Sequence, residues 1–453
     1  MATLDESGKI HFVGIGGCSM SGLARILHSQ GHGISGSDRE ENQFTKRLEK
    51  EGIPVFIGHR ADQAAGADLL VYSAAIRPDN PERVFAREHG IPEMERSVAL
   101  GQISERFSKV VAIAGCHGKT TITSMLAYIN EAARLDATVH VGGYMELLDG
   151  GVAIGAGDTL ITEACEYVES FLTLSPTLAL INNIDNDHLD CYRDIDHIVS
   201  TFFRFCSLVP PEGKIIGCID DPHVCNLLPV LDRATITYGL FKGDFHAANI
   251  EYDALGNPSF ELIDHGENRG RISLSVPATH NVINALAAYA VSKELNVPFG
   301  VYSRAIAAFT NTKRRFEFMG ERDGIRVFHD YAHHPNEIKS ILEAASRVPH
   351  NKLFCVFQCN SYTRARTLFC TTLDCFNLAT EVLVPDIYPG REKDTGMVHS
   401  RDMVAAINAS GARARYLPTF DDIRTYLDEN ASKGDLVLTV GSGDVYSKTA
   451  LLL

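Results

Sequence analysis

The sequence lacks an excess of basic residues, a long apolar run and a paired-cysteine motif. Its 42 lysines and arginines are outnumbered by 57 aspartates and glutamates, which gives a net charge of −15. A chain this acidic lacks the basic face that general binding to nucleic acid or to an anionic membrane requires. We therefore expect neither partner, and anionic ligands must be held by local lysines and arginines.

No stretch approaches the ~18 consecutive apolar residues of a membrane-spanning helix. The sequence starts with MATLDESGK, which is polar and acidic, unlike the basic and then apolar start of a signal peptide. The eleven cysteines include no C-x-x-C pair, which favours buried thiols over disulfides or a zinc site. Together these absences predict a cytoplasmic protein.

A glycine-rich turn between a β-branched run and a helical pattern is the most informative part of the sequence. It reads GCHGKTT, at 115–121, and follows the strand-like segment KVVAIA. The backbone N–H groups of such a turn bind phosphate oxygens, and so does the positive end of the next helix. Lys119 reaches the outer phosphates of a nucleoside triphosphate, and the Thr120 hydroxyl is a ligand for Mg²⁺. This turn therefore predicts a triphosphate-binding loop.

Strand-like apolar runs alternate with helical patterns in three successive blocks. At 453 residues the chain exceeds what one hydrophobic core organises, and its length favours roughly three domains. The alternation predicts an α/β fold with mostly parallel sheets, whose ligands gather beyond the carboxyl ends of the strands. We expect a Rossmann-like domain at 1–105, a P-loop ATPase-like domain at 106–311 and a second Rossmann-like domain at 312–453.

The first block opens with a second glycine-rich turn. The segment GIGGCSMSG, at 14–22, follows a strand and opens a helix, and Asp38 closes the next strand about 20 residues later. This arrangement imitates a dinucleotide-binding fingerprint, but Ser19 takes the place of the third glycine. The pattern favours a diphosphate at the helix N-terminus over NAD or FAD.

The second block carries polar residues at its strand ends. Glu163 ends the strand-like segment TLITE, and His188 follows LALINNID. With Thr120, they could share Mg²⁺, which needs oxygen-rich surroundings. Histidine is an unusual ligand for magnesium, so His188 is equally compatible with a hydrogen-bonding role in the core. His280 and Asn281 either begin a closely packed helix or present polar edges to a purine base.

The third block contributes a basic turn and a histidine-rich strand end. The turn NTKRRF, at 311–316, is either a solvated linker or a phosphate clamp. The segment DYAHHP, at 330–335, could suggest zinc, but no further His or Cys pattern completes a tetrahedral set. Arg364 is suited to pairing with a carboxylate.

Ten segments occur in a fixed order from residue 14 to residue 444, and over nearly the whole chain they resemble the Mur ligase family. They read GIGGxxMSGLA, GCHGKTT, EACExxxSFL, NIDNDHLD, HNVINALAA, RRFE, DYAHHPNEI, QxxxYTR, IYxxREKD and GSGD. The resemblance implies an ATP-dependent ligase of peptidoglycan precursor synthesis. It would join L-alanine to the carboxylate of UDP-N-acetylmuramate through an acyl phosphate, with ATP and Mg²⁺ as cofactors.

The resemblance also implies roles for single residues. Catalytic roles fall to Lys119, Glu163, His188, Arg315 and His333. The metal would be held by Thr120, Glu163 and His188. ATP would be bound by Gly115, Cys116, His117, Gly118, Lys119, Thr120, Thr121, His280, Asn281 and Asp330. The small-molecule substrates would be bound by Gly16, Gly17, Ser37, Asp38, Ser73, Tyr331, His334 and Arg364. The protein is expected to be a monomer or a homodimer.

The chain departs from the family pattern near the expected amino-acid pocket, where Cys359, Asn360 and Ser361 replace Pro-His and a further residue. This leaves three alternatives open: a ligase that recycles a murein tripeptide, a paralogue that uses another amino acid, and a non-catalytic nucleotide-binding regulator. The segment 198–210 contains no lysine. Sister ligases carry a carbamate-modified lysine there, so its absence agrees with the alanine-adding branch.

Overall fold

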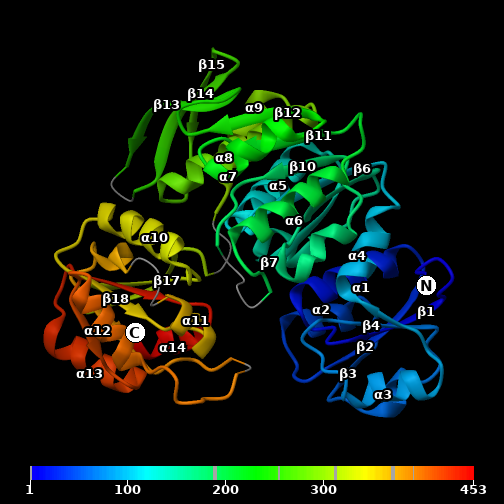
Figure 1. The fold of residues 1–453 in the computed structure, drawn as a ribbon, viewed down its shortest axis with the longest axis horizontal. Helices are drawn as coiled ribbons and strands as arrows, with labels where there is room; N and C mark the ends of the chain where they lie inside the picture. Colours follow the sequence, from blue (N-terminus) through cyan, green and yellow to red (C-terminus); the bar gives the residue numbers. More distant parts are fainter. Residues whose placement is uncertain (1–2, 187–190, 254–255, 311–313, 369–372, 391) are drawn as a thin grey trace. The chain divides into compact units, whose positions relative to one another are not determined.

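The computed structural model describes all residues except 1–2, 187–190, 254–255, 311–313, 369–372 and 391 (Figure 1). His188 and the predicted domain boundary at 311/312 therefore lie outside the described residues. The chain divides into two compact units, each considered by itself below. The first unit comprises Met1–His246, Ile263–Arg269 and Asn284–Ile306. The second unit comprises Ala247–Leu262, Gly270–Ile283 and Ala307–Leu453.

The first sheet is parallel, with the strand order β3-β2-β1-β4-β5. Strand order reverses at β1, and in an open α/β sheet such a switch point is where ligands bind. The strands are β1 (Lys9–Val13), β2 (Gly33–Asp38), β3 (Val55–Ile57), β4 (Leu69–Tyr72) and β5 (Glu93–Glu95). The helices are α1 (Cys18–Ser29), α2 (Gln43–Lys50), α3 (Pro81–Glu88) and α4 (Arg96–Ser104).

The second sheet has ten strands in the order β15-β14-β13-β12-β11-β10-β6-β9-β7-β8. From β7 to β13 the recorded pairings are parallel, whereas β8 runs antiparallel to β7. The strands are β6 (Lys109–Ala114), β7 (Thr138–Met145), β8 (Gly150–Ala153), β9 (Thr159–Glu163), β10 (Leu178–Ile181), β11 (Lys214–Cys218), β12 (Ala234–Gly239), β13 (Phe245–Tyr252), β14 (Pro258–Asp264) and β15 (Glu267–Ser273). The helices are α5 (Lys119–Ala133), α6 (Ile195–Ser207), α7 (Pro222–Leu227), α8 (Thr279–Glu294) and α9 (Phe299–Ala308).

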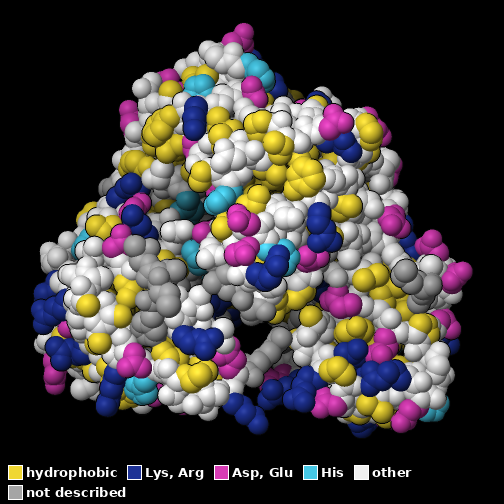
Figure 2. Space-filling model, viewed as in Figure 1, with side chains coloured by type: hydrophobic (Ala, Val, Ile, Leu, Met, Phe, Trp, Pro, Cys, Tyr) yellow, Lys and Arg dark blue, Asp and Glu magenta, His cyan; other side chains and the backbone are white. Residues whose placement is uncertain are grey.

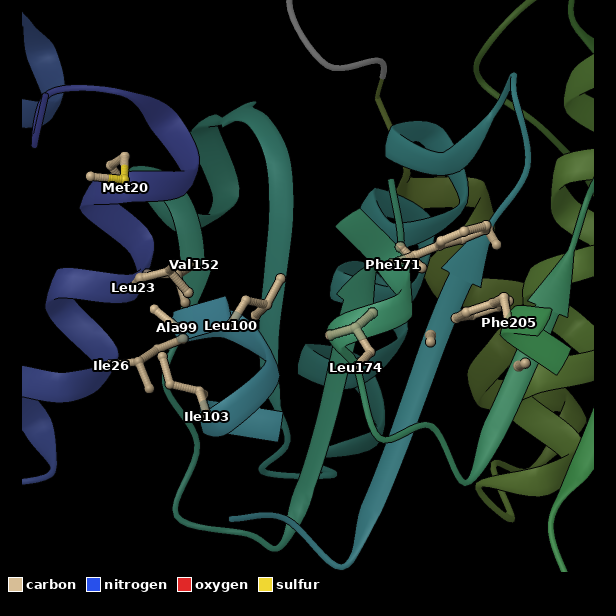
Figure 3. Close-up of a cluster of buried hydrophobic side chains, with 14 of the residues drawn as sticks. Met20, Leu23, Ile26, Ala99, Leu100, Ile103, Val152, Phe171, Leu174 and Phe205 are labelled. Atoms are coloured by element: carbon tan, nitrogen blue, oxygen red, sulfur yellow. The ribbon is translucent and has the colours of Figure 1, made fainter. Parts of the chain in front are cut away.

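One hydrophobic core runs through much of the first unit (Figure 3). Figure 3 shows Leu23 of α1 near Val152 of β8 and α4 residues such as Ile103. Further along the same core, the rings of Phe171 and Phe205 stack with centroids 4.5 Å apart. Because buried apolar area stabilises a fold roughly in proportion to its size, this shared core ties the first sheet to the phosphate-loop sheet.

The third sheet lies in the second unit and has the order β16-β17-β21-β18-β19-β20. Only its edge pair β16–β17 is antiparallel among the described pairings. The strands are β16 (Glu317–Arg322), β17 (Ile325–Asp330), β18 (Leu353–Phe357), β19 (Glu381–Val384), β20 (Ala414–Tyr416) and β21 (Leu436–Val440). The helices are α10 (Pro335–Arg347), α11 (Tyr362–Leu368), α12 (Ser400–Ala409), α13 (Phe420–Asn430) and α14 (Val445–Thr449).

The predicted α/β fold with three sheet-containing domains is confirmed. The sequence patterns did not predict strands β3, β5, β7, β8, β13 to β16 and β20, because most of these are short or partly exposed and lack the continuous apolar run of a buried parallel strand. In Figure 2, basic and acidic side chains are interspersed on the visible surface. Within the described ranges, none of the helices is long and apolar enough to cross a membrane.

Candidate functional site

The phosphate loop lies between β6 and α5, and its glycines are required by space and by backbone conformation. Gly118 precedes α5 with φ +85°. A Cβ there would lie 2.6 Å from Asn182 Nδ2 and 2.7 Å from Asn284 Oδ1. Only glycine adopts this left-handed conformation without strain and leaves room for both amides. In the described part of the chain no side chain caps the start of α5, so its N–H groups are oriented for a phosphate.

Two asparagines that follow β10 hold the loop in shape. The His117 N–H donates to Asn183 Oδ1 at 2.8 Å, and the amide groups of Asn182 and Asn183 each donate to the His117 carbonyl at 3.0 Å. The His117 ring in turn lies 3.0 Å from Asp185 Oδ2. The loop is therefore preformed, because its backbone is fixed by the neighbouring strand end.

Lys119 projects back over the loop and is paired with an acidic side chain. Its Nζ donates to Glu166 Oε2 at 2.8 Å, to the Cys116 carbonyl at 3.2 Å and to the Gly115 carbonyl. Burial is the largest single effect and opposes the charged ammonium, but the Glu166 carboxylate and the thiols of Cys165 and Cys116 together outweigh it and raise the pKa of Lys119. Lys119 is thus a fixed cation at the place where the outer phosphates would lie.

The next residue of α5 meets the end of β9. Thr120 Oγ1 donates to Glu163 Oε2 at 3.1 Å, and the Gly142 N–H donates to Glu163 Oε1 at 2.6 Å. A hydroxyl and a carboxylate side by side are the oxygen donors that Mg²⁺ prefers. These two residues therefore fit a magnesium ion. Thr121 is only 7% exposed, so its side chain belongs to the core.

The turn after β1 is held by residues that the sequence assigned to ligand binding. The Gly16 N–H donates to Asp38 Oδ2 at 2.7 Å, and a Cβ on Gly16 would lie 2.8 Å from that same oxygen. Gly17 precedes α1, and among the described residues no side chain caps that helix. Ser73 accepts from the Ala75 N–H at 3.2 Å. The structure therefore brings the β1 turn and Asp38 together at the strand-order switch.

Beneath this turn lies a buried polar cluster that the sequence did not predict. The hydroxyl of Ser37 is fully buried and donates to the Glu82 carboxylate at 2.8 Å. The same carboxylate contacts His11 Nε2 and His59 Nδ1, each at 2.7 Å. The observed contacts of Ser37 are thus internal, and its predicted contact with a substrate stays a prediction.

In the second unit, Asp330 ends β17 and anchors the basic turn. Its carboxylate accepts from the Phe316 N–H and the Ala332 N–H, both at 2.7 Å. Burial raises the pKa of Asp330 to about 6, although the Arg315 guanidinium and these two donors act in the opposite direction. Arg315 itself lies 5.5 Å above the Tyr331 ring. Asp330 therefore fixes the backbone that carries Arg315.

The two adjacent histidines after β17 have different environments. His333 packs edge-on against Tyr331 with ring centroids 5.4 Å apart, and its Nδ1 lies 3.5 Å from Glu337 Oε2. His334 immediately precedes α10, and its side chain accepts from the Asn336 N–H at 3.4 Å, which makes it the N-cap of this helix. The geometry leaves His333 beside Tyr331 and gives His334 a structural contact.

Arg364 lies on α11, just after β18, whose carboxyl end shares a sheet edge with that of β17. The backbone N–H of Arg364 donates to Ser361 Oγ at 3.2 Å, and Ser361 has a left-handed φ of +77°. Asn360 Nδ2 donates to Ser442 Oγ at 3.1 Å, whereas Cys359 is buried. The unusual 359–361 segment therefore shapes the strand end on which Arg364 stands.

Near the start of α8, also in the second unit, Asn281 is 3% exposed, and its amide donates to the Pro277 carbonyl at 2.6 Å. His280 is half-buried. Nearby, Arg347 Nη1 donates to Thr279 Oγ1 at 3.0 Å, which ties α10 to the start of α8. The contact of His280 and Asn281 with a purine base stays a prediction.

Three family models match the chain in succession: "Mur ligase family, catalytic domain" at 9–108, "Mur ligase middle domain" at 113–292 and "Mur ligase, glutamate ligase domain" at 314–443. The chain belongs to the Mur ligase family. The phosphate loop lies in the middle-domain match, and Arg364 lies in the third.

Individual Mur ligases match over almost the full chain. A UDP-N-acetylmuramate–L-alanine ligase of Alkaliphilus metalliredigens is 45% identical over 98% of this chain and 96% of its own. One from Caldanaerobacter subterraneus is 44% identical with the same coverage. The crystal structure of a UDP-N-acetylmuramate-alanine ligase from Thermotoga maritima matches with a TM-score of 0.80 and 29% identity over 98% of both chains. A murein peptide ligase from Psychrobacter arcticus, at 24% identity and a TM-score of 0.71, shares the fold.

Sequence reasoning missed two residues that this Mur ligase places beside its loops. Glu166, in the EACE segment, pairs with Lys119, and His140 lies 3.1 Å from Ser19 Oγ. An acidic residue three positions after Glu163 was a signal for the first. Nothing local pointed to His140, because its partner lies 121 positions away.

Proposed function

We propose that this Mur ligase joins L-alanine to the carboxylate of UDP-N-acetylmuramate at the expense of ATP. The observation that carries the proposal is the 45% identity, over 98% of the chain, to a relative that bears this activity in its name. The phosphate loop and the Thr120–Glu163 pair supply the chemistry that such a reaction needs. We assign the uridine nucleotide to residues 1–105, ATP to 106–311 and the amino acid to 312–453.

The first step is transfer of the γ-phosphoryl group. A carboxylate oxygen of the substrate attacks the γ-phosphorus, the bond to the β-phosphate oxygen breaks, and an acyl phosphate and ADP result. Such transfer depends on in-line positioning and on neutralising charge more than on a protein nucleophile. Lys119, held over the loop, supplies a positive charge, and the N–H groups at the start of α5 supply oriented dipoles.

The metal site of the proposal consists of Thr120, Glu163 and His188. The hydroxyl and carboxylate oxygens of the first two lie 3.1 Å apart. Magnesium bound there would neutralise charge on the phosphates and orient them. The Gly142 N–H fixes the other Glu163 oxygen, so this carboxylate is positioned before any ligand arrives.

The second step is attack by the amine of L-alanine. Its nitrogen adds to the acyl carbon, the tetrahedral intermediate expels phosphate, and the amine loses a proton as the amide forms. Arg364 suits the carboxylate of the amino acid, because a guanidinium binds a carboxylate in a bidentate way. Tyr331 and His333, which pack together after β17, stand at the same sheet edge.

The decisive experiment is release of phosphate by the purified protein with ATP, Mg²⁺ and UDP-N-acetylmuramate. L-alanine, L-serine, glycine, the tripeptide L-Ala-D-Glu-diaminopimelate and no acceptor are compared. We expect release that depends on L-alanine. Release with only the tripeptide would identify a recycling ligase instead. ATP binding without release for any acceptor would identify a non-catalytic nucleotide-binding protein.

A further inference from the structure

The buried contact between Glu166 and Lys119 is not explained by binding of phosphate alone. Glu166 is 1% exposed, and its Oε2 lies 2.8 Å from Lys119 Nζ. A carboxylate this close to the loop repels the triphosphate, because like charges interact strongly where water is excluded. It also competes with the phosphates for the N–H groups of the lysine. A residue that weakens ligand binding in this way needs a compensating role.

The backbone around Glu166 is built to aim this side chain. The Glu166 carbonyl accepts from the Glu169 N–H at 2.8 Å and from the Tyr192 hydroxyl at 2.5 Å. In the turn that follows Glu166, Val168 has φ +48° and ψ +34°, and Glu169 has φ +58°. A left-handed conformation is a genuine outlier for a β-branched residue, and such strain persists only where the surrounding structure imposes it. The strained turn therefore holds Glu166 at a fixed place beside Lys119.

The geometry of the ammonium suggests what the pair does. Lys119 Nζ has three N–H donors, and in this structure they go to Glu166 and to the carbonyls of Gly115 and Cys116. If the Glu166 contact is kept, the two donors that face the loop can pass to phosphate oxygens. One anchored donor then limits the movement of a long and flexible side chain.

We infer that Glu166 is a positioning residue, which fixes the Lys119 ammonium for phosphoryl transfer at the cost of some affinity for ATP. The inference rests on the proposed ATP-dependent function and goes beyond it by assigning this residue. Positioning acts on the transition state, where a small displacement of a charge matters most. Charge repulsion acts already in the complex with ATP. The two effects can therefore be separated by experiment.

The test compares Glu166→Gln with wild type. Glutamine keeps the size of the side chain and loses its charge. We expect kcat to fall by about tenfold or more, in the range found when a supporting residue of a site is removed. The dissociation constant of ATP is measured by calorimetry without UDP-N-acetylmuramate or L-alanine. We expect it to equal that of wild type or to be lower. Unchanged kcat, or an ATP dissociation constant raised more than about threefold, would overturn the inference.

Glu169→Gln is the matched control. It makes the same chemical change in the same turn, but the Glu169 side chain points to Arg204, whose Nη1 donates to it at 2.9 Å. We expect kcat and ATP binding of this variant to match wild type. A loss of kcat equal to that of Glu166→Gln would assign the effect to the turn and would overturn the role of the carboxylate.

Glu166→Asp keeps the charge and shortens its reach, so it tests the same idea should Glu166→Gln fold poorly. We expect a kcat between those of wild type and Glu166→Gln, with thermal unfolding close to wild type. A kcat as low as that of a Lys119→Ala protein would count against positioning by charge. If the wild type itself releases no phosphate, the proposed function fails, whereas the expected ATP affinity of Glu166→Gln can still be measured.

Discussion

The hydroxyl of Ser19 lies 3.1 Å from His140 Nε2, which joins the first turn of α1 to strand β7 of the neighbouring sheet. The opposite ring nitrogen of His140 lies 3.1 Å from Thr162 Oγ1, one residue before Glu163. Arg96 Nη1 also donates to Ser19, at 3.3 Å. The residue that departs from the glycine fingerprint of the first block thus contacts the sheet of the phosphate loop.

His140 makes stability depend on pH. Burial, with a smaller contribution from Arg96, lowers its pKa to about 4, below the 6.5 of an exposed histidine. Its contribution is therefore fully present above pH 6.5 and is lost as pH falls from 6.5 to about 4. At 1.36 kcal/mol per pKa unit, the loss is about 3 kcal/mol.

The variant His140→Gln removes this titration and keeps a polar side chain. We expect it to be less stable than wild type at pH 7, with a difference that narrows as the pH falls toward 4. Urea unfolding at several pH values between 7 and 4 measures the difference. Burial also lowers the pKa of His329 to about 3. Because His329 is present in both proteins, its effect on stability cancels in the comparison. A difference that is constant with pH would contradict the prediction.

Gly118→Ala tests the shape of the phosphate loop. The new Cβ would lie within 2.7 Å of two amide groups, in addition to the strain of φ +85°. Gly52→Ala is the matched control, because Gly52 has φ +82° and no atom within 4 Å of the new Cβ. We expect Gly52→Ala to cost about 1 kcal/mol of unfolding free energy through backbone strain alone. Gly118→Ala should cost more and should also weaken ATP binding. If Gly118→Ala and Gly52→Ala had equal effects on the free energy of unfolding and on ATP affinity, the phosphate loop would adapt to the added Cβ, and the prediction would be wrong.

Lys119→Ala removes the cation of the loop. We expect phosphate release to fall at least about 100-fold, as when one oriented donor to a transition-state charge is lost. Binding of UDP-N-acetylmuramate, measured by calorimetry, should be largely unchanged, since we assign it to the first domain. Lys214→Ala, a surface lysine paired with Glu294, serves as the control. If Lys119→Ala lost phosphate release and UDP-N-acetylmuramate binding to the same extent, the domain assignment would be wrong.

Arg364→Ala tests the amino-acid pocket. Loss of a charge-assisted pairing of about 1.5–3 kcal/mol corresponds to roughly a 10- to 100-fold rise in KM for L-alanine. The KM for ATP should stay close to wild type. Arg366, on the same helix α11 but exposed, is the control. Kinetics of Arg364→Ala that equal those of Arg366→Ala would remove Arg364 from the site.

Patterns between near neighbours predicted much of the fold and part of the site. The run KVVAIA followed by GCHGKTT predicted the β6–loop–α5 unit, because β-branched residues, glycines and helix formers act on their own backbone. The same reasoning placed Glu163 at a strand end, where it meets Thr120. It failed for strands such as β13, which is partly exposed, and β15, which is mostly exposed, because they bury too little apolar surface to leave a continuous run.

The sequence by itself determined the alternation of buried strands and helices in three blocks and the position of both glycine-rich turns. Only the tertiary structure decided what each polar side chain contacts. Glu166 meets Lys119 across 47 positions, and Ser19 meets His140 across 121. Such pairs depend on how the sheets pack, and no local periodicity specifies a partner that far along the chain. Burial raises the pKa of Asp330 and lowers that of His140, whereas the pKa of Lys119 is raised against its burial by the negative groups that packing places beside it, above all the Glu166 carboxylate.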